Sequence, residues 1–429
     1  MKNNIVKVLL WDKEICKLQW DGGYKKGFGK VGAHISFNPD YHNFGFDIDP
    51  LGIYSKSSYL VRKGLSALCR ASEYEGLPRF LSGSLPDDWG NQVFASWIYN
   101  SNIRSSEVNA VDKLAYIGRR GIGGLEFLPE LYAASPDSSV ILEELYRLAR
   151  EIELSRSITS LNLDEHTAIK DLMKVGMSAG GKHPKAIIAI NWSTNEIRSG
   201  QIPLPDGFEQ YILKFRDSDA IPTSEIEYVY YLMACKSGIE MEECSLLPAG
   251  GANHFLTKRF DRKNGSKIHS STLRALCGEV TSYDDIFAIC RKLHLPYYDM
   301  DQLFRRAVFN YLAGVCDDHD KNFSFVLPEG GKWRLAPAYD ETFSVNYLNP
   351  LIGDRHYMSI GESNRQVRRE QLLGLAEHND IKGAGTIIDE IAEAVGQFAS
   401  LAADNGIGKQ VVDYISGFID VQIKNVSSK

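Results

Sequence analysis

The segment 301–343 constrains the fold of this chain more than any other stretch. It begins as a helical pattern, because Phe304, Ala307 and Tyr311 recur at three- and four-residue steps, and the pattern ends at Gly314 in a dense polar run. An apolar strand, a Pro-Glu-Gly-Gly turn and a second strand follow. The segment therefore predicts a helix, a polar loop and a β-hairpin, whose entry and exit lie close together in space.

The polar residues of this segment have a spacing that suits phosphoryl transfer. Asp317 and Asn322 follow the pattern D-x-x-x-x-N, and Asp340 lies beyond the predicted hairpin. Phosphoryl transfer needs a carboxylate that orients and deprotonates a hydroxyl, and oxygen ligands for magnesium. The spacing predicts Asp317 as the base and Asn322 and Asp340 as magnesium ligands. The alternative is a solvated, capped loop after a helix, since so short a pattern often arises by chance.

The segments CDDHDKNFSF and LAPAYD resemble the catalytic and metal segments of the HipA family, which are bacterial serine/threonine kinase toxins. The loop D-x-H-x-x-N is also similar to that of phosphoinositide kinases, whose fold resembles that of HipA. Matching N-terminal segments are Leu85-Pro86-Asp87 and Ile117-Gly118-Arg119 with Pro129-Glu130. The resemblance implies an α+β, two-lobed protein-kinase-like fold, with an extra N-terminal α+β subdomain and an all-α C-terminal lobe.

The domain organisation follows from length and pattern. A chain of 429 residues is expected to form two or three packed units, and this one changes from mostly β to mostly α patterns near residue 260. We expect an N-terminal HipA-like subdomain over residues 1–150, a nucleotide-binding lobe over 151–262 and a helical lobe with the catalytic loop over 263–429.

Composition excludes several classes of protein. The net charge of −7 argues against a wide nucleic-acid surface on the chain itself. The seven cysteines contain no C-x-x-C pair, which indicates neither a disulfide framework nor a zinc site and fits a reducing cytoplasm. The alternative reading of each cysteine is a small buried hydrophobe. The sequence shows no signal-peptide pattern and no apolar run long enough to span a membrane.

A glycine-rich segment precedes an apolar strand. Glycines at 176, 180 and 181 let successive N–H groups converge on phosphate oxygens, although a plain tight turn is the alternative. SAGGKHPKA resembles the Gly-rich loop of HipA-like proteins, which implies nucleotide contacts from Ser178, Ala179, Gly180 and Gly181. Ser178 is the candidate for autophosphorylation, which family members undergo in or beside this loop. A phosphate there would repel those of ATP, whereas the alternative is a serine that only caps the turn.

Lys214 is the only charged residue in the predicted strand YILKF. A strand lysine of a kinase binds the α- and β-phosphates and is held by a helix glutamate. Glu225 and Glu227 both lie on the next predicted helix, and Glu227 is the closer match to the family's N-E-Y. The alternative for Lys214 is a side chain that snorkels from a sheet edge.

The segment LTKRFDR resembles the family segment V-E-R-F-D-R, which links the lobes. The resemblance implies that the backbone of Thr257, Lys258, Arg259 and Phe260 hydrogen-bonds adenine and that Phe260 packs near the ring. Lys258 stands where the family has Glu, so a side-chain contact to the nucleotide is not implied. The alternative for the charged residues at 259, 261 and 262 is a surface ion-pair cluster that contributes little stability.

Four further residues surround the predicted base. By type, His319 could act as a base, but we expect it to organise the loop beside the nucleotide. Tyr339 is expected to pack or stack near the nucleotide. Asp318 and Asp320 are interpreted as charges on the solvent side of the loop.

The resemblance implies an ATP- and Mg2+-dependent serine/threonine protein kinase, the toxin of a toxin–antitoxin pair. Its partner would be a small helix-turn-helix, HipB-like antitoxin, which would supply the contact with DNA, and its substrate a translation-related protein such as an aminoacyl-tRNA synthetase. Two alternatives stay open: a kinase of a lipid or small molecule, and a nucleotide-binding regulatory pseudokinase. The absence of a basic amphipathic stretch disfavours a lipid substrate. The presence of Lys214, Asp317, Asn322 and Asp340 disfavours a pseudokinase.

Overall fold

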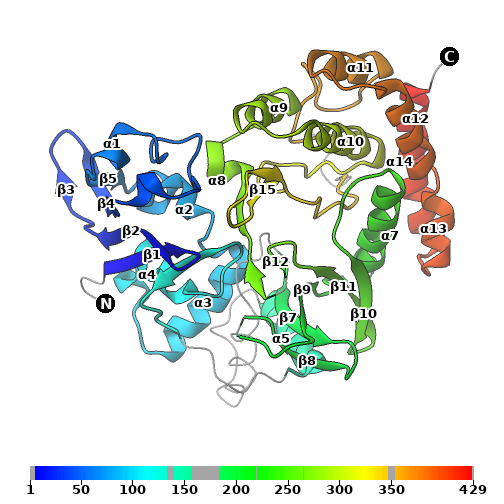
Figure 1. Cartoon of the computed structure of the whole chain (residues 1–429). Coiled ribbons are helices and arrows are strands. Elements are labelled where there is room, and N and C mark those ends of the chain that lie inside the picture. Colours follow the sequence, from blue (N-terminus) through cyan, green and yellow to red (C-terminus); the bar gives the residue numbers. More distant parts are fainter. Residues whose placement is uncertain are drawn as a thin grey trace.

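The structure is a computed structural model of the whole chain, in which three parts pack together (Figure 1). The residues that it describes are 5–132, 140–155, 183–201, 203–218, 220–263, 265–345 and 353–427. Within these residues, no helix combines the length and the apolarity needed to cross a bilayer.

The N-terminal part is a mixed layer of sheet and helices. Its strands follow the order β3-β4-β2-β1-β6, and β5 also pairs with β4. Alternate residues of β1 point into the core, and β1 pairs with β2 as an antiparallel hairpin. The elements are β1 (Ile5–Leu10), β2 (Lys13–Trp20), β3 (Tyr24–Lys25), β4 (Gly29–Phe37), α1 (Tyr59–Arg62), β5 (Ala67–Arg70), α2 (Arg79–Ser82), α3 (Asp88–Asn100), α4 (Ala110–Ile117) and β6 (Leu125–Leu128).

The middle part is an antiparallel sheet in the order β10-β11-β9-β7-β8. The apolar run AIIAI in β7 is fully buried. Helix α5 spans residue 150, where the first domain boundary is predicted, and packs through Tyr146 on Phe215 and His254. The predicted domain boundaries stay a prediction. The elements are α5 (Leu142–Ser155), β7 (Lys185–Asn191), β8 (Glu196–Ser199), β9 (Glu209–Lys214), α7 (Thr223–Lys236), β10 (Cys244–Ala249) and β11 (Ala252–Lys258).

The C-terminal part is mainly helical. The elements are β12 (Arg262–Lys263), β13 (Ser266–Lys267), β14 (His269–Thr272), α8 (Leu273–Cys277), α9 (Tyr283–Lys292), α10 (Tyr297–Ala313), β15 (Ser324–Leu327), β16 (Arg334–Leu335), α11 (Arg369–His378), α12 (Ala384–Val395), α13 (Phe398–Asp404) and α14 (Lys409–Val426). Helix α10 ends where predicted, because Gly314 takes a left-handed conformation with φ 72°. The predicted hairpin is present as β15 and β16, and its second strand is shorter than expected. Strand β14 joins it as an unpredicted third strand.

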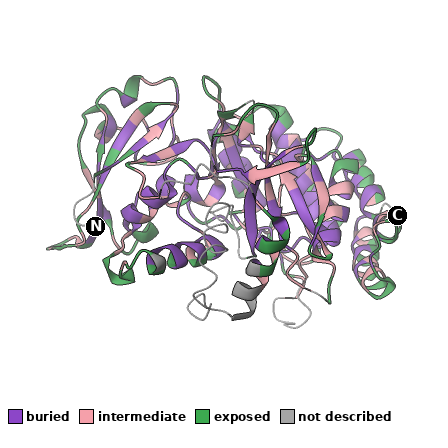
Figure 2. Ribbon diagram, turned by 90° about the horizontal axis from the view of Figure 1, so that it is seen from below, coloured by how far each residue is buried: buried purple, intermediate pink, exposed green. Residues whose placement is uncertain are grey.

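The three parts share one apolar core. Buried residues such as Leu10, Trp89, Leu213 and Phe304 belong to a single contact cluster, although they come from different parts of the sequence. Figure 2 shows the buried residues along the strands of both large sheets, with exposed residues on the outer faces of the peripheral helices. The predicted α+β fold is confirmed, and its continuous core means that the parts depend on one another for stability.

A buried ion cluster joins the N-terminal part to the segment that follows β11. The Asp261 carboxylate accepts hydrogen bonds from Arg259 Nη2 and Arg262 Nη1, each at 2.7 Å, and from the amide of Gly123 at 2.6 Å. Arg262 also donates to the carbonyls of Gly121 and Gly123, at 2.9 and 3.0 Å. We call it the hinge cluster, because it lies in the segment that the family resemblance assigns to the link between the lobes. It is not the weak surface cluster that sequence reasoning allowed, since Arg259 and Asp261 are each only 2% exposed.

The two arginines also decide the charge state of the cluster. Burial alone would raise the pKa of Asp261, but attraction to Arg259 and Arg262 outweighs it and holds the pKa well below its ordinary value. The carboxylate therefore stays ionised in the folded protein, and its contribution to stability is lost only as the pH falls below about 4.

We expect Asp261→Asn to lower the free energy of unfolding by about 3–5 kcal/mol, because it leaves two buried guanidinium groups without their carboxylate. The matched control is Asp389→Asn, whose carboxylate is 60% exposed and pairs with Arg369 at the surface. That change should cost less than about 1 kcal/mol. Urea denaturation of both variants measures the difference, and equal losses would contradict a stabilising role for the hinge cluster.

Candidate functional site

The core of the candidate site is an ion triad around Lys214. Lys214 lies at the end of β9, and its Nζ donates to a carboxylate oxygen of Glu227 on α7 and to Oδ1 of Asp340 beyond β16. The predicted pairing with Glu227 is confirmed. The alternative glutamate, Glu225, accepts instead from Asn253 at 3.0 Å and lies 3.6 Å from Arg216. Elements far apart in sequence thus meet at one ammonium group.

Burial and mutual attraction set the charges of this triad. Burial alone would lower the pKa of Lys214, but attraction to Asp340 and Glu227 outweighs burial and raises the pKa above its ordinary value. The lysine is therefore charged. Burial raises the pKa of Glu227, attraction to Lys214 opposes this rise, and repulsion from Asp340 adds to it. Burial also acts to raise the pKa of Asp340, yet Lys214 and Lys185 outweigh it and lower that pKa. Asp340 is therefore an ionised carboxylate, as a metal ligand must be.

The backbone of Asp340 is held in a conformation that few non-glycine residues adopt. Its φ is 58°, in the left-handed region. Such a residue costs on the order of 1 kcal/mol and persists only where its surroundings hold it. The contact with Lys214 is one of these restraints, so the geometry aims the carboxylate at the end of β9.

The predicted base and its partner lie in the loop between α10 and β15. Asn322 Nδ2 donates to the carbonyl of Asp317 at 2.9 Å, and its backbone amide donates to the carbonyl of His319 at 2.8 Å. The Asp317 amide donates to Ser344 Oγ at 2.9 Å, four residues beyond Asp340. The side chain of His319 accepts from the backbone amide of Lys321 through Nδ1 at 3.3 Å, and its expected role as an organiser of the loop stays a prediction.

The Asp317 carboxylate faces outward and is 71% exposed, which leaves it accessible to a hydroxyl substrate. Partial loss of water raises its pKa, and repulsion from Asp340 and Asp318 adds to this rise. His319 Nε2 lies 3.9 Å from Oδ1 and acts in the opposite direction. A raised pKa suits a carboxylate that has to accept a proton.

The interpretation of Asp318 and Asp320 as solvent-side charges is wrong, because each is only 1% exposed. Asp318 accepts hydrogen bonds from Tyr283 Oη at 2.9 Å and from the amide of Tyr357 at 2.8 Å. Asp320 pairs with Arg274 Nε at 2.9 Å. The two carboxylates point inward because each finds donors that replace water.

Sequence reasoning missed Lys185, which lies opposite Lys214 in the pairing of β7 with β9. Lys185 is only 3% exposed, and burial lowers its pKa while Asp340 acts to raise it. The sequence held a signal for this residue, because Lys185 follows the glycine-rich segment and begins an apolar strand. It adds a second cationic group to the side of the sheet that carries the ion triad.

The segment 257–260, which is predicted to bind adenine, has contacts within the protein. Phe260 stacks on Tyr339 with ring centroids 5.8 Å apart, so the two rings that are predicted to pack near the nucleotide lie next to each other. Lys258 pairs with Glu209 on the neighbouring strand, which takes its side chain away from the site. The amides of Lys258 and Arg259 donate to Glu243 and Gln210, so these two donors are used within the protein. Thr257 pairs with Cys244 in the sheet.

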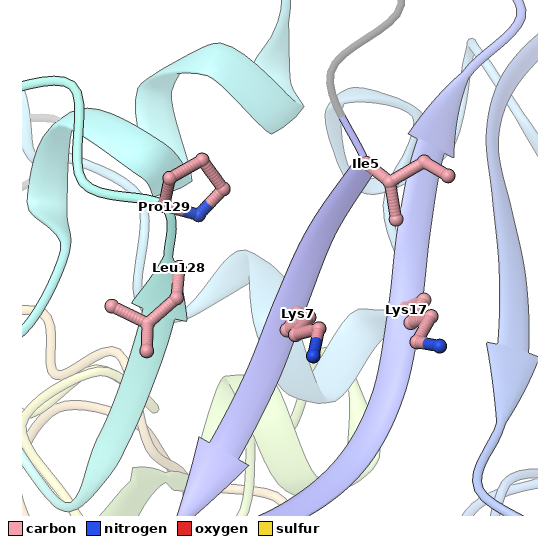
Figure 3. Close-up of a pocket in the computed structure, with 5 residues that line it drawn as sticks. All are labelled: Ile5, Lys7, Lys17, Leu128 and Pro129. Atoms are coloured by element: carbon pink, nitrogen blue, oxygen red, sulfur yellow. The ribbon is translucent and has the colours of Figure 1, made fainter.

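The Gly-rich segment, with Ser178, Ala179, Gly180 and Gly181, lies outside the described residues, so its nucleotide contacts and the modification of Ser178 stay predictions. A surface hollow of about 420 Å³ is found elsewhere, between β1, β2 and β6 (Figure 3). Ile5, Lys7, Lys17, Leu128 and Pro129 line it. This hollow contains none of the predicted site residues and is not a candidate for their chemistry.

Two family descriptions match the chain. The HipA-like C-terminal domain matches residues 177–400, which include Lys214, Asp317 and Asp340, and the HipA N-terminal domain matches residues 6–128. The chain belongs to the HipA family. The family resemblance seen in its sequence motifs is therefore confirmed.

Relatives and a solved structure extend this result. The chain is 28% identical over 196 residues to a Haemophilus influenzae protein named "Putative kinase", covering 41% of this chain and 55% of that protein. It is 25% identical over 227 residues to a Sinorhizobium fredii protein named "Putative kinase Y4dM", covering 48% and 55%. The chain thus spans about half the length of these relatives. The solved structure of HipA of Shewanella oneidensis with HipB and operator DNA matches the chain with a TM-score of 0.68 and 17% sequence identity. The match covers 98% of this chain and 97% of that one, and it shows the shared fold.

The residues present fit a magnesium ion in their chemistry. Asp340 offers an ionised carboxylate, and Asn322 uses its amide nitrogen on Asp317, which directs the amide oxygen elsewhere. Magnesium prefers such hard oxygen ligands and keeps water and phosphate oxygens in its remaining positions. No cluster of three or more His, Cys, Asp or Glu side chains suited to a metal occurs among the described residues.

We expect Lys214→Met to destabilise the protein more at pH 8 than at pH 5. Without the lysine, the pKa of the buried Glu227 rises further above its unfolded value of about 4.3, and a raised carboxyl pKa costs stability once the pH exceeds the unfolded value. Thermal melting at the two pH values measures the effect. Lys332→Met, at an exposed site in the neighbouring hairpin, is the control, and an equal shift of Tm at both pH values for Lys214→Met would contradict this account.

Proposed function

We propose that this chain is an ATP- and Mg2+-dependent serine/threonine protein kinase. The observation that carries the proposal is the ion triad of Lys214, Glu227 and Asp340 beside the loop that holds Asp317 and Asn322. Protein kinases use a strand lysine paired with a helix glutamate, a catalytic aspartate and two magnesium ligands in this arrangement. Membership of the HipA family and the kinase names of its relatives support the proposal.

Each residue has a defined task in the proposed reaction. Lys214 binds the nucleotide phosphates while Glu227 holds its ammonium group, and Lys185 adds positive charge on the adjacent strand. Asp317 orients the substrate hydroxyl and accepts its proton while the hydroxyl oxygen bonds to the γ-phosphorus of ATP, whose bond to the β-phosphate oxygen breaks to release ADP. Asn322 and Asp340 would hold magnesium, which would neutralise charge on the nucleotide phosphates. Phe260 and Tyr339 present stacked rings that suit a nucleotide base.

The remaining expectations belong to this proposal. The loop of Ser178, Ala179, Gly180 and Gly181 would cover the phosphates, and Ser178 would be an autophosphorylation site. We also propose a small helix-turn-helix antitoxin as partner, through which contact with DNA would be indirect. The related Shewanella protein was solved with HipB and operator DNA, which supports this partner. A translation-related protein is the proposed substrate class.

We expect Asp317→Asn to lower phosphotransfer about 10²–10⁴-fold, because the amide cannot accept the hydroxyl proton. Thermal stability should change little, since the carboxylate is largely exposed. Transfer of labelled phosphate from ATP in cell extract measures activity, and Asp404→Asn, at another exposed aspartate, is the matched control. Near-normal turnover by a folded Asp317→Asn protein would overturn the assignment of the base, and an inactive wild-type protein that binds ATP would indicate a pseudokinase.

We expect Asp340→Ala to abolish magnesium-dependent ATP binding and Asn322→Ala to weaken it. Each change removes an oxygen ligand, and Asp340→Ala also removes a partner of Lys214. Calorimetric titration of ATP with and without magnesium separates the loss of the metal ligand from the loss of the Lys214 partner. Asp404→Ala is the control. If a nucleotide complex held its magnesium on other residues, with Asn322 and Asp340 turned away, this account of the metal site would be wrong.

A further inference from the structure

A buried carboxylate anchors the loop that carries the proposed base. Asp318 follows Asp317 directly, and its two oxygens accept four hydrogen bonds. The donors are Tyr283 Oη at 2.9 Å, His356 Nδ1 at 3.3 Å and the amides of Tyr357 and Met358 at 2.8 and 3.1 Å. Its 1% exposure means that these four donors replace water almost entirely. The backbone next to Asp317 is therefore held by contacts with α9 and with the segment 356–358.

A chain of hydrogen bonds continues from this anchor to the segment of the proposed metal ligand. With its amide nitrogen turned toward Glu341, Asn310 donates to Glu341 Oε2 at 2.7 Å, and its amide oxygen lies 3.0 Å from Tyr283 Oη. Tyr283 has a single hydroxyl proton, which it shares between Asp318 Oδ2 at 2.9 Å and this amide oxygen. Glu341 follows Asp340 directly and is only 6% exposed. The path therefore runs from Asp318 through Tyr283 and Asn310 to Glu341, and we call it the buried polar chain.

The two ends of the buried polar chain are the immediate neighbours of the two proposed functional carboxylates. Asp318 adjoins Asp317, and Glu341 adjoins Asp340. Tyr283 on α9 and Asn310 on α10 belong to helices that are themselves part of the packed core. None of the four members has access to the candidate site, since each is at most 6% exposed. They can act on the reaction only through the residues beside them.

We propose that Tyr283 and Asn310 are positioning residues, which hold the loop of Asp317 and the segment of Asp340 in register for phosphoryl transfer. This inference rests on the proposed function. A displacement of reacting groups by about 1 Å can cost about 100-fold in rate, so a link that fixes both segments is significant for turnover. A second contact, from the Asp317 amide to Ser344 Oγ, links the same two segments near the surface. Removal of the buried polar chain should therefore loosen their register without unfolding either one.

The test is Tyr283→Phe, which removes one hydroxyl and keeps the ring. The matched control is Tyr41→Phe in the N-terminal part, because Tyr41 is also fully buried, donates to the carboxylate of Asp47 at 3.2 Å and accepts from the amide of Ile48 at 3.0 Å. Both variants lose the same kind of bond, but only Tyr283 belongs to the buried polar chain. Full-length proteins are compared by magnesium-dependent ATP turnover, with cell extract supplying the phosphoryl acceptor, and by hydrogen exchange of the amides in 316–322 and 340–345.

We expect Tyr283→Phe to lower kcat about 10–100-fold while the ATP dissociation constant stays within about twofold, and to speed hydrogen exchange in both segments. Tyr41→Phe should change none of these quantities, even at an equal loss of Tm. Unchanged exchange in Tyr283→Phe, or faster exchange with unchanged kcat, would overturn the inference. Equal effects of the two variants would also overturn it, because they would indicate a general loss of stability.

The two arms separate this inference from the proposed function. A wild-type protein without ATP turnover would overturn the kinase proposal and the role of the buried polar chain in turnover, and the exchange arm alone would then show whether the chain couples the two segments. If Tyr283→Phe does not fold, Asn310→Leu interrupts the same chain with a side chain of similar size. The same drop in kcat and the same faster exchange in Asn310→Leu would support the inference, and their absence would overturn it.

Discussion

The contact on which the rest of the site depends is the ammonium group of Lys214 between two carboxylates. A charge removed from water is costly unless partners replace the water, and here the ammonium group of Lys214 pairs with both carboxylates. The three residues lie on β9, on α7 and beyond β16. They can meet only when the middle sheet, its helix and the C-terminal part pack together. This requirement places Asp340 against the sheet and holds its backbone at a left-handed φ.

The same physical rule organises the molecule at two other places. Asp261 is satisfied by two arginines and by an amide of the N-terminal part, so the hinge cluster sets how that part lies against the segment after β11. Asp318 is satisfied by donors from α9 and from residues 356–358. In each case a buried charge has at least one donor from a distant segment, and a segment with predicted site residues lies immediately beside it.

Much of the fold followed from local patterns. The helix that ends at Gly314 and the hairpin after it come from short-range periodicity and turn residues, and the structure contains them. The choice of Glu227 as the partner of Lys214 came from the resemblance to the family's N-E-Y, and the structure contains that pair as well. Strand β14 was missed because its sequence HSST has no apolar alternation and its pairing with β15 is long-range. Lys185 was missed because a lysine at the start of an apolar strand usually marks a solvent-facing end.

The sequence by itself determined the family, the α+β class and the order of the predicted functional residues along the chain, because motif spacing and hydrophobic periodicity are properties of neighbouring residues. Only the tertiary structure decided which charges are buried. Asp317 and Asp318 are adjacent and chemically identical, yet one carboxylate faces solvent and the other meets four donors. The side on which a carboxylate finds donors depends on segments distant in sequence, and no local pattern records that.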